Sequence, residues 1–488
     1  MEEEDTDKML IKKQVQDEHM GNFSYFEIIG NVQPSIQHPE DQLDEDEIDN
    51  KNYRLYGYRW IICLFFSTQQ MAFGMCNVGY SPIFPFMSKV YTININYVTS
   101  LGIMYAPAFI IVNFFSNRIA SKHGMATPIF IASLLGTSGA FLRLLVPYGF
   151  EYMFIGQLIN AIGMPFVQAH GATVAQWWFG DNERSLVTAL TSVAIPVGSI
   201  IGLLLPNFFV SDKEEDFVKA KEDIWTLTLV QSIIFACMSI PNFLVARDKP
   251  VTPPSASAEK SLYHKNEDTL IEREDEAQKT NFRQEFYQVF WSSNFWRLNI
   301  SQMFTHSIFA VLGSSVSVIV TPFGYDAAQI SYIGGAFVLT GLIAAIIHGI
   351  ILDKYQKFKL HLMFISISSI VFTAIMAAVV KKNNIMLTLL SAIGLGASTI
   401  PIIGVSFEFW GQITYPANEN IGCGLIVLSM WFLGTLEPYL IIYMIDNYSR
   451  WWPFGIFGIG LFISLTFSFT VDEDLRKNKI VHANAESS

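Results

Sequence analysis

Residues 328–354 read AQISYIGGAFVLTGLIAAIIHGIILDK, and this stretch decides the class of fold. From residue 328 to residue 352 it contains no Asp, Glu, Lys or Arg. A helix crosses a bilayer core of about 30 Å with about 20 apolar residues. The stretch therefore predicts a transmembrane helix that ends at the charged pair Asp353–Lys354.

The composition extends this prediction to most of the chain. Of its 488 residues, 51% are hydrophobic and 15% are charged, whereas a soluble domain carries about 25% charged residues. Stretches long enough to span recur near 59–87, 97–117, 126–147, 151–178, 185–209, 224–246, 295–321, 328–352, 360–380, 385–411, 420–445 and 450–470. The sequence predicts an all-α membrane protein with twelve transmembrane helices.

A long polar interruption divides these spans into two sets of six. It contains three prolines and the charged run 272–276 (EREDE), and such a composition does not bury a core. Two six-helix halves joined by a polar loop resemble the major facilitator superfamily, and internal repeats are typical of secondary transporters. We therefore expect an acidic disordered cytoplasmic tail (1–57), an N-terminal half (58–246), a charged cytoplasmic linker (247–294), a C-terminal half (295–470) and a cytoplasmic tail (471–488).

Lysine and arginine residues in the short loops set the expected orientation. An even number of spans puts both tails on one side, and that side carries most of the loop cations. The opposite side carries fewer, and its loop 212–223 has mixed charge. The bias predicts cytoplasmic tails in a multi-pass protein of the plasma membrane or of an internal organelle membrane.

The residues that usually carry metal, redox or hydrolytic chemistry are not arranged for it. The four cysteines lie within apolar stretches, and none belongs to a Cys-x-x-Cys pair. His170, His306 and His348 lie in spans four, seven and eight without the spacing of metal ligands, and we interpret them as packing residues. The chain has no phosphate-binding loop and no nucleophile-elbow motif. We expect no metal, no cofactor, no enzymatic activity and no nucleic-acid partner.

A short motif occurs at equivalent places in the two halves. Facilitator-superfamily proteins carry a Gly-x-x-x-Asp-Arg/Lys-type motif after spans two and eight. The second place here has Gly349, Asp353 and Lys354, whereas the first has Ser121 in the position of the acid. Asp353 and Lys354 are candidate gating residues, and the alternative is a solvated loop pair.

Two further stretches resemble one family within this superfamily. The first is 177–184 (WWFGDNER), and the second is 404–409 (GVSFEF) followed by 413–416 (ITYP) and Glu419. Both resemble the feline leukaemia virus subgroup C receptor-related transporters. The resemblance implies a facilitator fold and transport of a small organic solute such as choline, ethanolamine, haem or a pyridoxine-type vitamin. In the second stretch, the residues with a gating or packing role are Glu408, Thr414, Tyr415 and Glu419.

The resemblance leaves the substrate open. Choline-handling members place an aromatic residue in span one and glutamines in spans five and eleven. The matching positions here are Met75, Pro196 and Trp431, so both amides are missing. Aromatic faces hold quaternary ammonium groups well, and Trp431 supplies one such face.

Polar residues within the spans supply the remaining candidates. Gln69, Asn77, Gln168 and Gln302 either line a cavity or form hydrogen bonds between helices. Glu437, followed by Pro438, is either a counter-ion or proton site for transport, or the structural partner of Arg143.

These observations predict a transporter that works by alternating access. Its expected solute is an amine of the choline or ethanolamine type, or a vitamin-like molecule, moved without proton coupling. The alternatives are a haem transporter and a non-transporting membrane receptor or sensor with the same fold. The expected partners are the solute and the lipid bilayer, and we expect a monomer.

Overall fold

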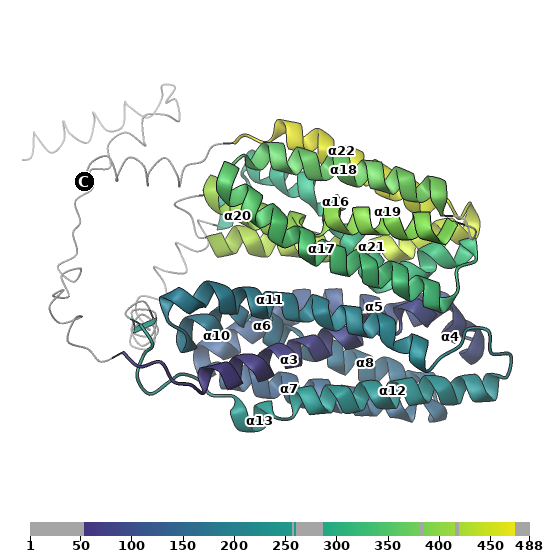
Figure 1. The fold of residues 1–488 in the computed structure, drawn as a ribbon, viewed down its shortest axis with the longest axis horizontal. Helices are drawn as coiled ribbons and strands as arrows, with labels where there is room; N and C mark the ends of the chain where they lie inside the picture. Colours follow the sequence, from purple (N-terminus) through teal and green to yellow (C-terminus); the bar gives the residue numbers. More distant parts are fainter. Residues whose placement is uncertain (1–52, 256–257, 260–285, 381–383, 415–418, 474–488) are drawn as a thin grey trace, which may run out of the picture. The chain divides into compact units, whose positions relative to one another are not determined.

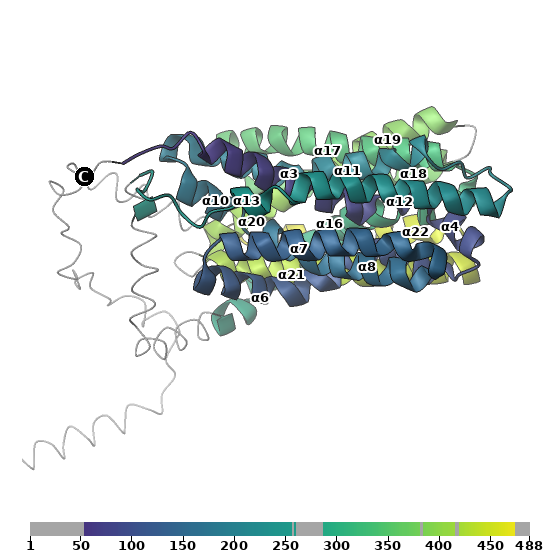
Figure 2. The same cartoon turned by 90° about the horizontal axis from the view of Figure 1, so that it is seen from below.

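A computed structural model describes residues 53–255, 258–259, 286–380, 384–414 and 419–473, and these described residues belong to one compact unit. Helices account for the secondary structure of these described residues. In the core of a bilayer the backbone finds no water, so each apolar stretch satisfies its own polar groups by forming a helix. The long helices run along a common direction (Figures 1 and 2).

The N-terminal half forms one layer of the unit, drawn from purple to teal in Figure 1. Its helices are α3 (Arg59–Val78), η1 (Ser81–Ile83), α4 (Phe84–Tyr91), α5 (Ile95–Ile103), α6 (Tyr105–His123), α7 (Ala126–Leu142), η2 (Arg143–Tyr148), α8 (Phe150–Gly163), α9 (Pro165–Gln168), α10 (Gly171–Trp178), α11 (Asp181–Leu204), η3 (Leu205–Phe208), α12 (Phe217–Ser239) and α13 (Asn242–Val245).

The C-terminal half forms the second layer, drawn from teal-green to yellow. Its helices are α16 (Ser293–Val320), η4 (Thr321–Phe323), α17 (Ala327–Tyr355), α18 (Phe358–Val379), α19 (Ile385–Thr399), α20 (Ile402–Thr414), α21 (Glu419–Asn447) and α22 (Trp452–Thr470). The predicted arrangement of two helical halves is confirmed.

The predicted fourth span is broken, which accounts for the difference in the helix count. Within the described residues, eleven helices are long and apolar enough to cross a membrane, and the region 151–178 is not among them. It consists of α8, α9 and α10, with breaks at Met164 and at Ala169–His170. Pro165 opens α9 and lacks the N–H that a continuous helix requires. The span is therefore a discontinuous helix.

Glycines let α3 and α11 pack backbone to backbone within the N-terminal half. A Cβ on Gly198 would lie 1.9 Å from the Met71 carbonyl oxygen, and one on Gly74 would lie 2.1 Å from that of Ile195. Only a residue without a Cβ allows this approach. Since α11 is held so closely on one side, its other side is available to the space between the halves.

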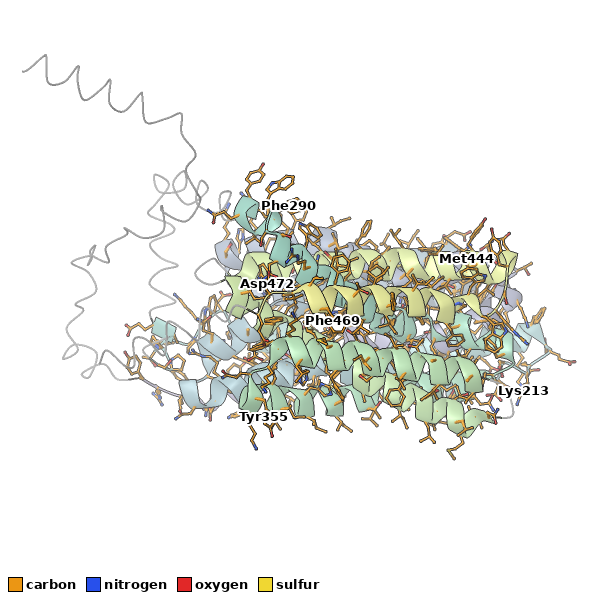
Figure 3. The ribbon with its side chains drawn as sticks, turned by 90° about the horizontal axis from the view of Figure 1, so that it is seen from above. Lys213, Phe290, Tyr355, Met444, Phe469 and Asp472 are labelled. Atoms are coloured by element: carbon orange, nitrogen blue, oxygen red, sulfur yellow. The ribbon has the colours of Figure 1, made fainter. Side chains whose placement is uncertain are left out.

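The two halves are joined at the end of the unit that carries Lys213, which we call the outer end. Figure 3 shows Lys213 at this end, and Tyr355 and Asp472 at the opposite one. The Asp212 carboxylate accepts a hydrogen bond of 2.8 Å from the Ala327 N–H. The Ser331 hydroxyl donates to the Asn207 side-chain oxygen at 2.9 Å, and Lys213 pairs with Asp326 at 3.3 Å. We call these three contacts the outer clasp.

At the opposite end, residues 53–58 pack against the start of the predicted linker. The Tyr56 and Thr252 hydroxyls are 3.0 Å apart, and the Tyr58 hydroxyl donates to the Val245 carbonyl at 2.8 Å. Arg59 donates two hydrogen bonds of 3.0 Å to Glu183 at the start of α11. These contacts attach the chain around the start of α3 to the segment that follows α12 and to the start of α11.

Candidate functional site

A cavity of about 460 Å³ lies between the two halves. Its size falls within the range of about 300–1,000 Å³ that is usual for small-molecule sites. The N-terminal half contributes residues from α3, α5, α6, α9, α10 and α11 to its lining, and the C-terminal half contributes residues from α16, α17, α20 and α21. A central cavity enclosed by both halves suits a solute that is passed from one side of the membrane to the other.

Aromatic rings from both halves line this cavity. Phe109 on α6 faces Trp431 on α21 with ring centroids 5.9 Å apart. Phe309 on α16 and Phe407 on α20 also line it. Among the described lining residues there is no Asp, Glu, Lys or Arg. The cavity therefore offers aromatic faces and neutral polar groups to its occupant.

The polar lining includes side chains whose hydrogen-bonding capacity is not used within the described residues. The Asn77 Oδ1 and Gln168 Oε1 atoms are buried without a partner. By contrast, Gln70 donates from Nε2 to the Val167 carbonyl at 3.2 Å. Gln168 lies at the break between α9 and α10, so the discontinuity of the fourth span presents its side chain to the cavity.

Three of the seven predicted binding residues line the cavity: Asn77, Gln168 and Trp431. Gln69 does not, because it is buried among α3, α7 and α12 and donates to the Ser133 and Ser239 hydroxyls at 2.8 and 3.2 Å. Met75 is buried in the core of the N-terminal half.

The remaining two predicted binding residues are buried in the C-terminal half and are not part of the cavity lining. Gln302 lies on α16, and neither of its amide atoms has a partner within the described residues. Glu437 lies one turn beyond the lining residue Gly434 on α21, next to Ser307 of α16. A role for either residue in solute binding stays a prediction.

The structure does not form the alternative pair between Glu437 and Arg143. Arg143 is buried in the N-terminal half, where it donates to Gln157 Oε1 at 2.9 Å and to Cys76 Sγ at 3.3 Å. Its guanidinium also lies 5.7 Å from the centroid of the Tyr80 ring. Arg143 therefore joins the helices of its own half.

The predicted gating residues lie towards the end opposite the outer clasp. Lys354 is exposed near the end of α17, with its ammonium 5.5 Å from the Tyr355 ring centroid, and Glu408 is exposed on α20. The helix α20 ends at Thr414 and α21 begins at Glu419. Tyr415 and the side chains of Asp353, Thr414 and Glu419 lie outside the described residues. The gating role stays a prediction.

An acid is present at the turn that follows the first motif copy, although it is not part of that copy. Asp248, which follows the sixth span, accepts a hydrogen bond of 2.8 Å from the Ala126 N–H at the start of α7. A Cβ on Gly124, where φ is +85°, would lie 2.2 Å from the same carboxylate oxygen. The carboxylate at this turn therefore comes from a distant segment.

His306 is the site residue that sequence reasoning assigned to packing. It lies on α16, its side chain is 1% exposed, and it lines the cavity. Neither ring nitrogen has a partner within the described residues. One feature of the sequence could have indicated a functional role for His306. It follows Gln302 by four residues, which places two polar side chains on one face of an apolar helix.

Comparisons with known proteins agree with this architecture. The chain is 25% identical over 438 residues to the human choline/ethanolamine transporter FLVCR2, covering 88% of this chain and 79% of that protein. It is 24% identical over 427 residues to Solute carrier family 49 member A3 of Xenopus tropicalis, covering 84% and 81%. These similarities confirm the resemblance to the feline leukaemia virus subgroup C receptor-related transporters.

The comparisons extend to solved structures and to a family model. The fold is similar to that of a D-xylose-proton symporter, with a TM-score of 0.65, 13% identity and coverage of 86% of this chain and 99% of that one. It is also similar to the inward open xylose transporter XylE of E. coli, with a TM-score of 0.61, 13% identity and coverage of 84% and 96%. Residues 64–434 match the model of the Major Facilitator Superfamily, and the chain belongs to that superfamily of membrane transporters.

Proposed function

We propose that this chain carries a small organic amine across the membrane by alternating access and without ion coupling. The observation that supports this most directly is the aromatic pair Phe109–Trp431, which closes on the cavity from opposite halves. An ammonium group over such rings gains about 0.5–2 kcal/mol. A relative of similar length, human FLVCR2, is named a choline/ethanolamine transporter. A vitamin-like amine satisfies the same chemistry.

The cavity lining favours an amine over haem. Haem carries two propionate carboxylates, which need cations or many donors when they leave water. The described lining contains no Lys or Arg. Apart from His306, the described lining contains none of the Asp, Glu and His side chains that relay protons in coupled transporters, which supports facilitative movement.

The outer clasp supports alternating access. Its contacts cross from residues 207–213 to residues 326–331 and hold the halves together at one end. A carrier of this kind must separate such contacts when it opens to the outer side. We propose that Asp353, Lys354 and Glu408, with Thr414, Tyr415 and Glu419, perform the matching role at the opposite end.

We further propose that the tails and the linker face the cytoplasm, because the loop cations gather on that side. The cavity is enclosed by the two halves of one chain, so a monomer suffices for transport. The function requires no catalytic step.

Uptake into proteoliposomes tests this function. Radiolabelled ethanolamine, choline, pyridoxine and a haem analogue are compared with and without a proton gradient. We expect saturable uptake of an amine that does not depend on the gradient, and a Phe109→Ala or Trp431→Ala variant should weaken it. Trp452→Ala, at the outer start of α22 and outside the cavity lining, is the matched control and should leave uptake unchanged.

Either of two results would overturn the proposal. Gradient-dependent uptake would contradict facilitative movement. Ligand-induced thermal stabilisation of folded protein without any uptake would instead identify a receptor or sensor.

A further inference from the structure

An unsatisfied imidazole is the unusual feature of the cavity. His306 is 1% exposed, and neither Nδ1 nor Nε2 has a hydrogen-bond partner among the described residues. Buried polar side-chain atoms in proteins are nearly always hydrogen-bonded, and each unmet group costs about 1–3 kcal/mol. Because His306 is one of the residues that line the cavity, its imidazole is a candidate contact for a solute that enters it.

The other histidines within the spans do not share this feature. The His170 Nε2 atom lies 2.9 Å from the Ser116 hydroxyl. His348 Nδ1 lies 2.8 Å from His361 Nε2. Packing with a local partner therefore explains these histidines, whereas within the described part of the chain the His306 ring has Phe309 as its aromatic neighbour, with ring centroids 6.5 Å apart.

Two further unmet atoms line the same cavity from the other half. Asn77 Oδ1 comes from α3, and Gln168 Oε1 comes from the broken fourth span. Both are acceptors, and an imidazole supplies an acceptor nitrogen as well as a donor. A solute with several hydrogen-bond donors therefore finds acceptors on both halves.

We propose that His306 is a substrate-contact residue, and that it makes the cavity select amines bearing N–H groups over quaternary ammonium ions. This proposal rests on the proposed function. A protonated primary amine donates N–H bonds to the imidazole and to the two amide oxygens. A quaternary ammonium has no N–H and uses only the aromatic faces, so it leaves the buried acceptors unmet.

A methylation series of one compound tests the selectivity. Ethanolamine, N-methylethanolamine, N,N-dimethylethanolamine and choline share a hydroxyethyl group and lose N–H donors one by one. Affinity is measured on the purified full-length chain by ligand-induced thermal stabilisation. We expect affinity to fall along the series, with choline binding about tenfold or more weakly than ethanolamine, as follows from the loss of a charge-assisted hydrogen bond.

Substitutions of His306 assign the selectivity to this side chain. His306→Phe keeps a ring but removes both nitrogens, so it should bring the affinities for ethanolamine and choline together by weakening the former. His306→Gln retains a donor and an acceptor and should preserve part of the preference. Thr305→Val is the matched control, because Thr305 is buried on the same helix with its hydroxyl unpartnered within the described residues, yet does not line the cavity.

The outcomes separate the two proposals. Equal binding of all four compounds by the wild type, or an unchanged preference in His306→Phe, overturns the role of His306 while leaving amine transport intact. If His306→Phe does not fold, the affinities for ethanolamine and choline are compared in His306→Gln and His306→Asn instead, and an unchanged preference in both overturns the role of His306. Absence of binding of any member of the series by folded protein overturns the proposed function itself.

Discussion

The Asp212 carboxylate accepts a hydrogen bond of 2.8 Å from the backbone N–H of Ala327, the first residue of α17 in the opposite half. The same helix end is capped from within by Asp326, which accepts from the Gln329 N–H in a capping box. The N-terminus of a helix carries partial positive charge and free N–H groups, which favour carboxylates. The N-terminal half thus binds the C-terminal half through the first turn of α17.

Removal of this contact should favour opening at the outer end. Asp212→Ala loses a helix cap, which is worth about 1 kcal/mol, or about a fivefold shift in the equilibrium between the two states. Ser314→Cys places a thiol in the cavity lining near Gly102. We expect a membrane-impermeant thiol reagent applied from the outer side to label this cysteine faster in Asp212→Ala.

Lys213→Ala is the control for that measurement. Lys213 is 77% exposed in its pair with Asp326, and exposed ion pairs contribute little. Labelling should therefore stay close to that of the parent protein. Equal labelling in Asp212→Ala and in the parent would contradict the role of Asp212 in the outer clasp.

The close packing of α3 and α11 should make Gly198 intolerant of a side chain. A Cβ there would lie 1.9 Å from the Met71 carbonyl oxygen, so Gly198→Ala forces the two helices apart. We expect a loss of about 1–3 kcal/mol, seen as a lower unfolding temperature. Gly458→Ala on α22, where no described residue beyond the glycine's own stretch of helix has an atom within 4 Å of the added Cβ, should leave the unfolding temperature nearly unchanged.

The two span-one residues Gln69 and Asn77 should respond to substitution in opposite ways. Gln69→Leu removes buried interhelical hydrogen bonds, which are worth about 0.6 kcal/mol each in membranes, and should lower the unfolding temperature without changing solute affinity. Asn77→Leu removes an unpartnered oxygen from the cavity and should weaken solute binding without lowering stability. The same pattern in both variants would refute this division of roles.

The acid that caps α7 should matter although it is far away in the sequence. Asp248→Ala removes the acceptor for the Ala126 N–H and should lower stability by about 1 kcal/mol. Asp248→Asn should lose less, because asparagine also caps helices well. Ser121→Ala, at an exposed position of the first motif copy, is the control for thermal unfolding of the two Asp248 variants. An unfolding temperature for Asp248→Ala equal to that of the control would count against the cap.

Two helical regions, α17 and the broken fourth span, show what the sequence alone could predict of the fold. The apolar stretch 328–352 predicted α17 because length and absence of charge are enough to identify a span. The stretch 151–178 is less apolar, with Glu151 and His170 among its residues, and its break at Pro165 required attention to a single residue that removes a backbone donor. The apolar composition of each stretch therefore predicted the spans, and a single residue, Pro165, indicated the break in the fourth span.

Two adjacent residues of α3 show which structural features the local sequence does not determine. Gln69 and Gln70 are adjacent and identical, yet Gln70 lines the cavity and Gln69 lies in the core. Successive residues of a helix point about 100° apart, so two adjacent identical residues face different neighbours. Which of the two faces the cavity depends on the helices packed around α3.

The sequence by itself determined the helical membrane fold, the two halves and the superfamily, because these follow from apolar length and from short local motifs. Only the tertiary structure brought His306, Asn77 and Gln168 to one cavity, supplied Asp248 to the turn before α7, and joined Asp212 to Ala327. These contacts connect residues that are far apart in the chain. Their formation depends on helix rotation and on the packing between halves, which no local pattern of residues encodes.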